Sequence, residues 1–202
     1  MPDAKPRFMF SPPDQLAIGP LRCAWGPHRH GTPVAPLVRP WLATTLGIPD
    51  DALPLRRDAH GRPRLDASAD VSWSHSGERL LVATGRGVQL GADLELLRPR
   101  PRALALAERF FVRAETAALR ALPEATREAA FVRLWCAKEA VLKAHGRGLA
   151  FGLHRLEFAP DDDTWTLVDC DPALGRPSDW TLHAFAPMPG YLASLAWRPQ
   201  PL

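Results

Sequence analysis

Residues 135–143 combine a carboxylate and two ammonium groups at helical spacing, and they read Trp-Cys-Ala-Lys-Glu-Ala-Val-Leu-Lys. Of the 25 lysines and arginines in the 202-residue chain, only Lys5, Lys138 and Lys143 are lysines. A lysine ammonium meets an anion as a compact point charge, whereas an arginine guanidinium is a planar fork. Two lysines in one segment of an arginine-rich chain therefore indicate a candidate active site that contacts phosphate oxygens.

A helix is predicted to position these groups. Apolar residues recur at steps of three and four from about residue 124 onward, and the pattern ends at the glycines Gly146 and Gly148. On such a helix Glu139 and Lys143 lie four residues apart and share a face, with Trp135 one turn before them. An ordinary surface Glu–Lys pair has the same spacing, so this motif alone leaves both interpretations open.

Two further carboxylates, Asp93 and Glu95, follow a predicted strand. Apolar runs at 80–84 and 88–90 flank Gly85-Arg86-Gly87, a pattern that predicts a β-hairpin closed by a glycine turn. Side chains alternate along a strand, so Asp93 and Glu95 point to the same face. Two carboxylates on one face favour an oxygen-preferring cation such as Mg²⁺. The alternative is a solvated strand end.

Two shorter motifs precede these acids. Trp73-Ser74-His75-Ser76-Gly77 offers hydroxyls and an imidazole as donors for a phosphate, and Gly61-Arg62-Pro63 offers a guanidinium. Taken alone, the first is equally a turn before a strand and the second a turn with a basic residue.

The order of these motifs resembles that of the 4'-phosphopantetheinyl transferases: G-R-P, S-H-S-G, G-A-D-L-E, then W-C-A-K-E-A-V-L-K followed by G-R-G-L. The likeness is closest to the larger, single-chain type, which activates polyketide and nonribosomal peptide synthetases, such as surfactin synthetase. It covers about residues 61–149, with support from Glu108-Arg109-Phe110-Phe111 and Glu115.

The resemblance implies an α+β fold. Two similar subdomains are expected, related by a pseudo-twofold, each a small antiparallel sheet packed with helix. They would comprise residues 1–100, with the D-x-E motif, and 101–202, with the lysine-bearing helix. The run Arg98-Pro99-Arg100-Pro101-Arg102 lies at this boundary, and its prolines suit neither a strand nor a helix interior, which predicts a hinge. A hairpin of 180–185 with 191–197 would match the predicted one at 80–90.

The resemblance also implies an activity. Such enzymes move the phosphopantetheine arm of coenzyme A to a serine of an apo acyl or peptidyl carrier protein and release adenosine 3',5'-bisphosphate. Carried over by position, the Mg²⁺ ligands are Asp93, Glu95 and Glu139. Glu139 and Lys143 are the expected catalytic residues, with either Glu139 or a water on the metal taking the serine proton. The expected coenzyme A contacts are Ser74, His75, Lys143, Arg62, Arg29 and His30.

Two of these positions depart from the family pattern. Arg62 stands where relatives usually have lysine, which keeps the charge but changes its geometry. The arginine that contacts the 3'-phosphate of coenzyme A is expected nine residues before Arg39, where the chain has His30 beside Arg29. The sequence therefore leaves open which of the two serves.

Composition bounds the remaining possibilities. The net charge is +3 and the pI about 9.1, but the arginines are interleaved with 22 acids, so no basic stripe for nucleic acid is present. No apolar run reaches membrane-spanning length and no secretory signal opens the chain, so a soluble, cytoplasmic protein is expected. We also expect a monomer. Cys23, Cys136 and Cys170 lack paired metal spacing and are expected to be reduced, mostly buried thiols.

The carrier protein is expected to dock on the segment 112–130. This segment mixes Arg113, Arg120 and Arg127 with Leu119 and Leu122, a combination that suits an acidic amphipathic helix. A surface helix without a partner is the alternative.

Two other classes of function share features with the transferase. A Mg²⁺-dependent phosphohydrolase also uses clustered acids and a lysine, but it needs no carrier protein. A non-catalytic module that binds coenzyme A or a carrier would be expected to lose the acids or Lys143, and this chain keeps all four residues.

Overall fold

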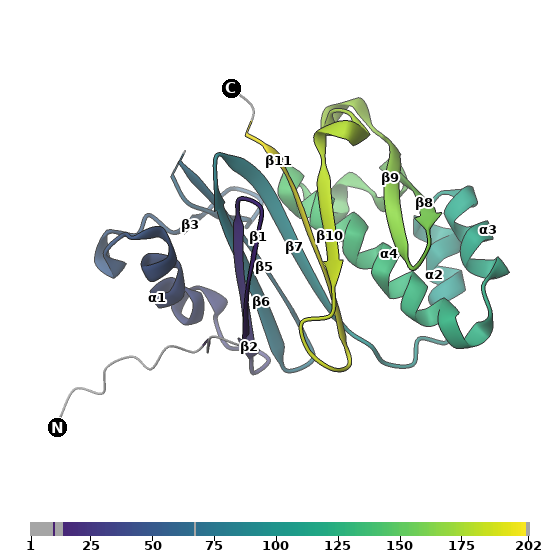
Figure 1. The fold of residues 1–202 in the computed structure, drawn as a ribbon, viewed down its shortest axis with the longest axis horizontal. Coiled ribbons are helices and arrows are strands. Elements are labelled where there is room, and N and C mark those ends of the chain that lie inside the picture. Colours follow the sequence, from purple (N-terminus) through teal and green to yellow (C-terminus); the bar gives the residue numbers. More distant parts are fainter. Residues whose placement is uncertain (1–9, 11–13, 67, 201–202) are drawn as a thin grey trace.

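The computed structural model describes residues 10, 14–66 and 68–200. It is an α+β fold of small antiparallel sheets packed with helices, as predicted. From one side to the other, a helix, a four-stranded sheet, a three-stranded sheet and a long helix follow in layers (Figure 1).

The first sheet has the strand order β1-β2-β6-β5. Its strands are β1 (Gln15–Ile18), β2 (Leu21–Pro27), β5 (Ala69–Ser76) and β6 (Arg79–Arg86). Helix α1 (Val34–Leu46) covers its outer face and ends at Gly47, whose left-handed conformation suits glycine. A short ladder of β3 (Arg56–Arg57) with β4 (Pro63–Arg64) carries the Gly61-Arg62-Pro63 loop.

The predicted hairpin around Gly85-Arg86-Gly87 is wrong in its pairing, although both strands exist. Strand β6 is already bonded to β2 on one edge and to β5 on the other, so no edge remains for the next strand. The tight turn instead lies one strand earlier, between Ser76 and Arg79. After Gly87 the chain crosses to the second sheet as β7 (Val88–Leu96).

The second sheet has the order β10-β11-β7 and joins the two halves of the chain. Strands β10 (Thr181–Phe185) and β11 (Tyr191–Pro199) form the predicted antiparallel hairpin. Strand β11 also pairs with β7, and this register places Ser194 opposite Asp93. The predicted domain boundary near residue 100 therefore falls just after a strand that is bonded to the second half of the chain.

Helix α4 (Glu124–His145) matches the predicted helix and ends at Gly146 in the left-handed conformation. It packs on the outer face of the second sheet, beside α2 (Ala103–Phe110), α3 (Arg113–Ala121) and the hairpin of β8 (Leu156–Asp161) with β9 (Thr164–Cys170) (Figure 1). Single-turn 3₁₀ helices are η2 (Asp50–Ala52), η3 (Gly148–Phe151), η4 (Leu153–Arg155), η5 (Pro172–Leu174) and η6 (Pro177–Asp179).

The predicted hinge around Arg100 is irregular backbone between β7 and α2. Cys23 and Cys136 are buried, Cys170 is half-buried, and all three are free thiols. Among the described residues, no helix is long and apolar enough to cross a membrane.

Candidate active site

Strand β7 presents the acids toward α4, as the alternation of side chains predicts. Leu94 is fully buried between the two sheets, so Asp93 and Glu95 point the other way. Two residues before Asp93, Gly91 lies against the main chain of α4, where a Cβ would lie 1.9 Å from the carbonyl oxygen of Ala140. The absence of a side chain at Gly91 lets the helix approach the strand closely enough for their polar groups to meet.

Asp93 and Lys143 form the centre of the site. Lys143 Nζ lies 2.6 Å from Asp93 Oδ1 and donates to Ser74 Oγ at 2.9 Å. The Ser74 hydroxyl in turn donates to Asp93 Oδ1 at 2.8 Å. Asp93 is 3% exposed, and its second oxygen, Oδ2, is buried without a hydrogen-bond partner in the part of the chain that the structure describes. Ser74, Asp93 and Lys143, which belong to three separate sequence motifs, thus come together from β5, β7 and α4.

Glu139 lies one turn before Lys143 on α4 and is buried. Burial is the largest cause that raises the pKa of Glu139, to about 7, and the charges of Asp93 and Glu95 raise it further while Lys143 opposes them. The three carboxylates thus influence one another across the space between β7 and α4.

Glu95 is held by groups that sequence reasoning missed. Its carboxylate lies 2.5 Å from the guanidinium of Arg100 and accepts a hydrogen bond from Ser76 Oγ at 3.1 Å. Arg100 belongs to the predicted hinge, and its main-chain N–H donates to Glu128 of α4. The sequence contains no pattern that predicts this contact, because Arg100 simply lies between two prolines five residues after Glu95.

The carboxylates fit a divalent ion by their chemistry. Mg²⁺ prefers oxygen ligands and keeps several waters, so a few carboxylates are enough. The partnerless buried Oδ2 of Asp93 and the raised pKa of Glu139 both indicate negative charge that a cation would neutralise. Within the described residues, however, no three histidine, cysteine or acidic side chains are grouped to hold an ion together. Lys143 pairs with Asp93, and Arg100 pairs with Glu95.

Three histidines border the same site. His75, which follows Ser74 on β5, stacks on His28 with ring centroids 4.5 Å apart. Partial burial is the largest cause that lowers the pKa of His75, followed by the charges of His28, Lys143 and His30. The structure thus brings His30 near His75, and both His30 and Arg29 are exposed. Sequence reasoning did not predict the buried His28 as part of this site.

A cationic cavity opens beside Lys143. It measures about 250 Å³ and lies between the Gly61-Arg62-Pro63 loop, β5 and the glycine-rich end of α4. Its basic lining residues are Arg57, His60, Arg62, Lys143 and Arg147. The cavity therefore has the charge that a phosphorylated ligand requires.

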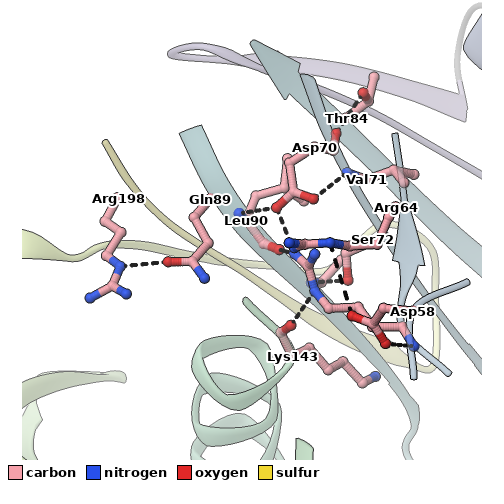
Figure 2. Close-up of polar contacts among 12 residues, drawn as sticks. Asp58, Arg64, Asp70, Val71, Ser72, Thr84, Gln89, Leu90, Lys143 and Arg198 are labelled. Carbon is pink, nitrogen blue, oxygen red and sulfur yellow. Dashed lines mark hydrogen bonds and ion pairs between the residues drawn. The ribbon is translucent and has the colours of Figure 1, made fainter. Parts of the chain in front are cut away.

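Arg62 lies at the base of this cavity but is buried in contacts within the protein. Its guanidinium pairs with Asp70 at 2.6 Å and donates to the carbonyl oxygens of Lys143 and Leu90 at 2.8 and 3.0 Å. Figure 2 shows Asp70, Leu90 and Lys143 converging on this point from β5, β7 and α4. The predicted contact of Arg62 with coenzyme A stays a prediction.

The first lysine of the motif has a different environment. Lys138 is fully buried, pairs with Glu115 of α3 at 2.7 Å, and donates to the carbonyl oxygens of Leu153 and Leu156. Burial lowers the pKa of Lys138 to about 8, although Glu115 acts to raise it. Lys138 thus ties α4 to neighbouring segments of the core, and of the two lysines only Lys143 faces the candidate site.

Comparison with known proteins identifies the family of the chain. Residues 89–196 match the family model of the 4'-phosphopantetheinyl transferase superfamily. The chain is 33% identical over 175 residues to the 4'-phosphopantetheinyl transferase HetI of Nostoc sp. strain PCC 7120, a match that spans 81% of this chain and 70% of that protein. It is 33% identical over 119 residues to the 4'-phosphopantetheinyl transferase psf-1 of Bacillus pumilus, spanning 58% of this chain and 50% of that protein.

The family also extends to animals. The chain is 30% identical over 135 residues to the L-aminoadipate-semialdehyde dehydrogenase-phosphopantetheinyl transferase of Mus musculus, spanning 60% of this chain and 44% of that protein. The chain belongs to the 4'-phosphopantetheinyl transferase superfamily. It is an enzyme of the transferase class to which these relatives belong.

Proposed function

We propose that this enzyme transfers the 4'-phosphopantetheine arm of coenzyme A to a serine of an apo carrier protein, and that the site between β7 and α4 carries out the reaction. The observation that carries the proposal is the convergence of Asp93, Glu139 and Lys143, buried acids and an ammonium, beside a cationic cavity of about 250 Å³. Phosphoryl transfer depends mainly on positioning and on stabilisation of charge, which such groups supply.

The reaction forms a bond between the serine Oγ and the phosphorus that bears the pantetheine arm, and it breaks the bond from that phosphorus to the bridging oxygen of the diphosphate. Adenosine 3',5'-bisphosphate leaves with the electron pair. Asp93, Glu139 and Glu95 would hold a Mg²⁺ ion, which would neutralise the charge that develops on the diphosphate.

The side chains have separate tasks in this scheme. Lys143 contacts the diphosphate oxygens as a point charge, and Ser74 and Asp93 hold its ammonium in place. His75 and one of the neighbouring Arg29 and His30 contact the phosphates of coenzyme A. The serine proton passes either to Glu139, which lies one turn before Lys143 in the site, or to a water on the metal.

The carrier protein is proposed to dock on α3, within the predicted segment 112–130. Arg113 and Arg120 are exposed on this helix, whereas Arg127 donates to the carbonyl oxygens of Leu119 and Leu122 at its end. Arg127 is therefore part of the structure of the helix end. The two exposed arginines suit an acidic surface, such as that of a peptidyl or acyl carrier protein.

The test is incubation of an apo carrier protein with the enzyme, coenzyme A and Mg²⁺, followed by intact-mass measurement of the carrier and chromatography of the nucleotides. Transfer predicts that the carrier gains one phosphopantetheinyl group while adenosine 3',5'-bisphosphate appears in equal amount. Replacement of the carrier serine by alanine is the matched control and should abolish both. Release of the nucleotide without carrier would instead indicate a hydrolase.

A further inference from the structure

Arg62 links three elements of the site through the two nitrogens it uses. Its Nη2 lies 2.6 Å from Asp70 Oδ2 on β5 and 3.0 Å from the carbonyl oxygen of Leu90 on β7. Its Nε donates to the carbonyl oxygen of Lys143 at 2.8 Å. That carbonyl lies in the last turn of α4, where carbonyl groups have no partner within the helix. Arg62 therefore caps the helix at the residue whose ammonium meets Asp93.

Asp70 completes the connection from the other side. Its Oδ2 accepts the main-chain N–H of Leu90 at 2.9 Å, and its Oδ1 accepts the N–H of Val71 at 2.9 Å. Leu90 is thus held through both its N–H and its carbonyl oxygen, three residues before Asp93 on the same strand (Figure 2). One ion pair therefore contacts both β7, three residues before Asp93, and the last turn of α4, which carries Lys143.

The burial of the pair argues against a direct contact between Arg62 and a ligand. The side chains of Arg62 and Asp70 are 7% and 10% exposed. The third nitrogen of Arg62, Nη1, is itself buried, and it has no hydrogen-bond partner among the described residues. A phosphate in the cavity would reach it only if the surrounding contacts opened. Burying such an ion pair costs desolvation, and a fixed geometry is one gain that offsets it.

We propose that Arg62 and Asp70 form a positioning clamp that sets the distance between Lys143 and Asp93, and that Arg62 does not bind a phosphate of coenzyme A. The role differs from the one expected for the glycine-x-proline motif from sequence. It rests on the proposed function for its effect on turnover, but the clamp itself is a property of the protein without ligand.

The test compares Arg62→Gln, Asp70→Asn and the double variant with the parent. The clamp predicts that each single variant lowers kcat by about tenfold or more, because a small misplacement of a catalytic group is costly. The KM for coenzyme A should stay within about twofold of the parent. The double variant should be no worse than the poorer single variant, since either change already opens the clamp.

Asp70→Asn separates the two roles of Arg62. If Arg62 bound a phosphate, removal of the neighbouring negative charge would not weaken coenzyme A binding, whereas Arg62→Gln would weaken it strongly. Calorimetric titration with coenzyme A and with dephospho-coenzyme A measures this directly. Loss of affinity confined to Arg62→Gln, or loss of the preference between the two ligands in that variant, would overturn the clamp.

A measurement that does not require enzyme turnover tests the clamp even if the proposed activity is wrong. Lys143 should react faster with an amine-acylating reagent in both single variants than in the parent, as measured by peptide mass spectrometry, because its ion pair with Asp93 is loosened. Unchanged reactivity would contradict the clamp even if no carrier were modified. Arg62→Lys serves where Arg62→Gln fails to fold. Arg64→Gln is the matched control. The Arg64 side chain is 45% exposed and its Nε lies as far as 3.9 Å from Asp58, so this variant should behave as the parent.

Discussion

The main chain of β7 at Gly91 lies directly against the main chain of α4 at Ala140. A Cβ on Gly91 would lie 1.9 Å from the carbonyl oxygen of Ala140 and 2.5 Å from the main-chain nitrogen of Ala144. Asp93 follows two residues after Gly91, and Lys143 three residues after Ala140. The close contact of strand and helix is therefore what brings the acid and the ammonium to 2.6 Å.

Gly91→Ala should both destabilise the protein and inactivate it. The added methyl group meets main-chain atoms that cannot move aside as a flexible side chain would, so the helix must shift outward at a cost of about 1–3 kcal/mol or more. Chemical denaturation measures the loss. Ala140→Gly should not rescue the variant, because the obstacle is the carbonyl oxygen of residue 140 and not its side chain. A variant as stable and active as the parent would show that the contact is unimportant.

The stability of the metal-free protein should depend on pH through Glu139. The pKa of Glu139 is about 7 in the folded protein and 4.5 as its ordinary value, so the folded state binds more protons between these values. Its contribution to stability is complete below pH 4.5 and is lost as the pH rises through 7. Because one pKa unit corresponds to about 1.4 kcal/mol, the contribution amounts to a few kcal/mol at most.

Calorimetric melting of the parent and of Glu139→Gln in a chelating buffer tests this dependence. The difference in free energy of unfolding between the two proteins should change in this pH range, with the parent losing stability relative to the variant as the pH rises. Addition of Mg²⁺ should restore stability to the parent at pH 8 more than at pH 5, because binding requires the carboxylate. Parallel curves for the two proteins would contradict the assignment.

The buried pair of Lys138 and Glu115 should matter for folding far more than an exposed pair. Both side chains are fully buried, so Glu115→Gln leaves an ammonium without its counter-charge and should cost about 3–5 kcal/mol of unfolding free energy. Glu108→Gln is the control, since Glu108 pairs with Arg120 on the surface and the loss should be at most about 1 kcal/mol. Equal losses in urea denaturation would refute the distinction.

Charge reversal on α3 should impair recognition of the carrier protein alone. Arg113→Glu with Arg120→Glu should raise the KM for an acidic carrier while the KM for coenzyme A stays unchanged, because the cationic cavity lies elsewhere. The effect should weaken at high salt. Arg22→Glu on β2 provides an exposed control. Equal effects on both substrates, or none, would reject the docking surface.

Local patterns in the sequence predicted the helix and the facing acids, because both depend on periodicity. The helical repeat placed Glu139 and Lys143 on one face of α4, and strand alternation placed Asp93 and Glu95 on one face of β7. Pairing between strands is not local. The glycines of Gly85-Arg86-Gly87 predicted a hairpin between β6 and β7. That prediction was wrong because both edges of β6 are already paired, one with β2 and the other with β5.

The site contacts that the sequence did not predict are also contacts between segments that no local pattern connects. Arg100 reaches Glu95 from the irregular segment that follows β7. His28 stacks on His75 from just beyond β2, where its main-chain N–H donates to Glu78 in the turn between β5 and β6. Neither contact follows from a helical or strand periodicity, so no sequence pattern predicts it. The structural role of Gly91 in the G-A-D-L-E motif is not visible in the sequence, because it depends on the helix at Ala140, 49 residues later.

The intact mass of an apo carrier protein after incubation with coenzyme A, Mg²⁺ and either the parent or Asp93→Asn tests the central claim most directly. The claim is that the acids and ammonium between β7 and α4 carry out phosphopantetheine transfer. Asparagine keeps the shape of the buried side chain but removes the charge that pairs with Lys143. We expect the parent to modify the carrier and the folded variant to be slower by about a hundredfold or more. Modification by the variant at the parent's rate would contradict the account.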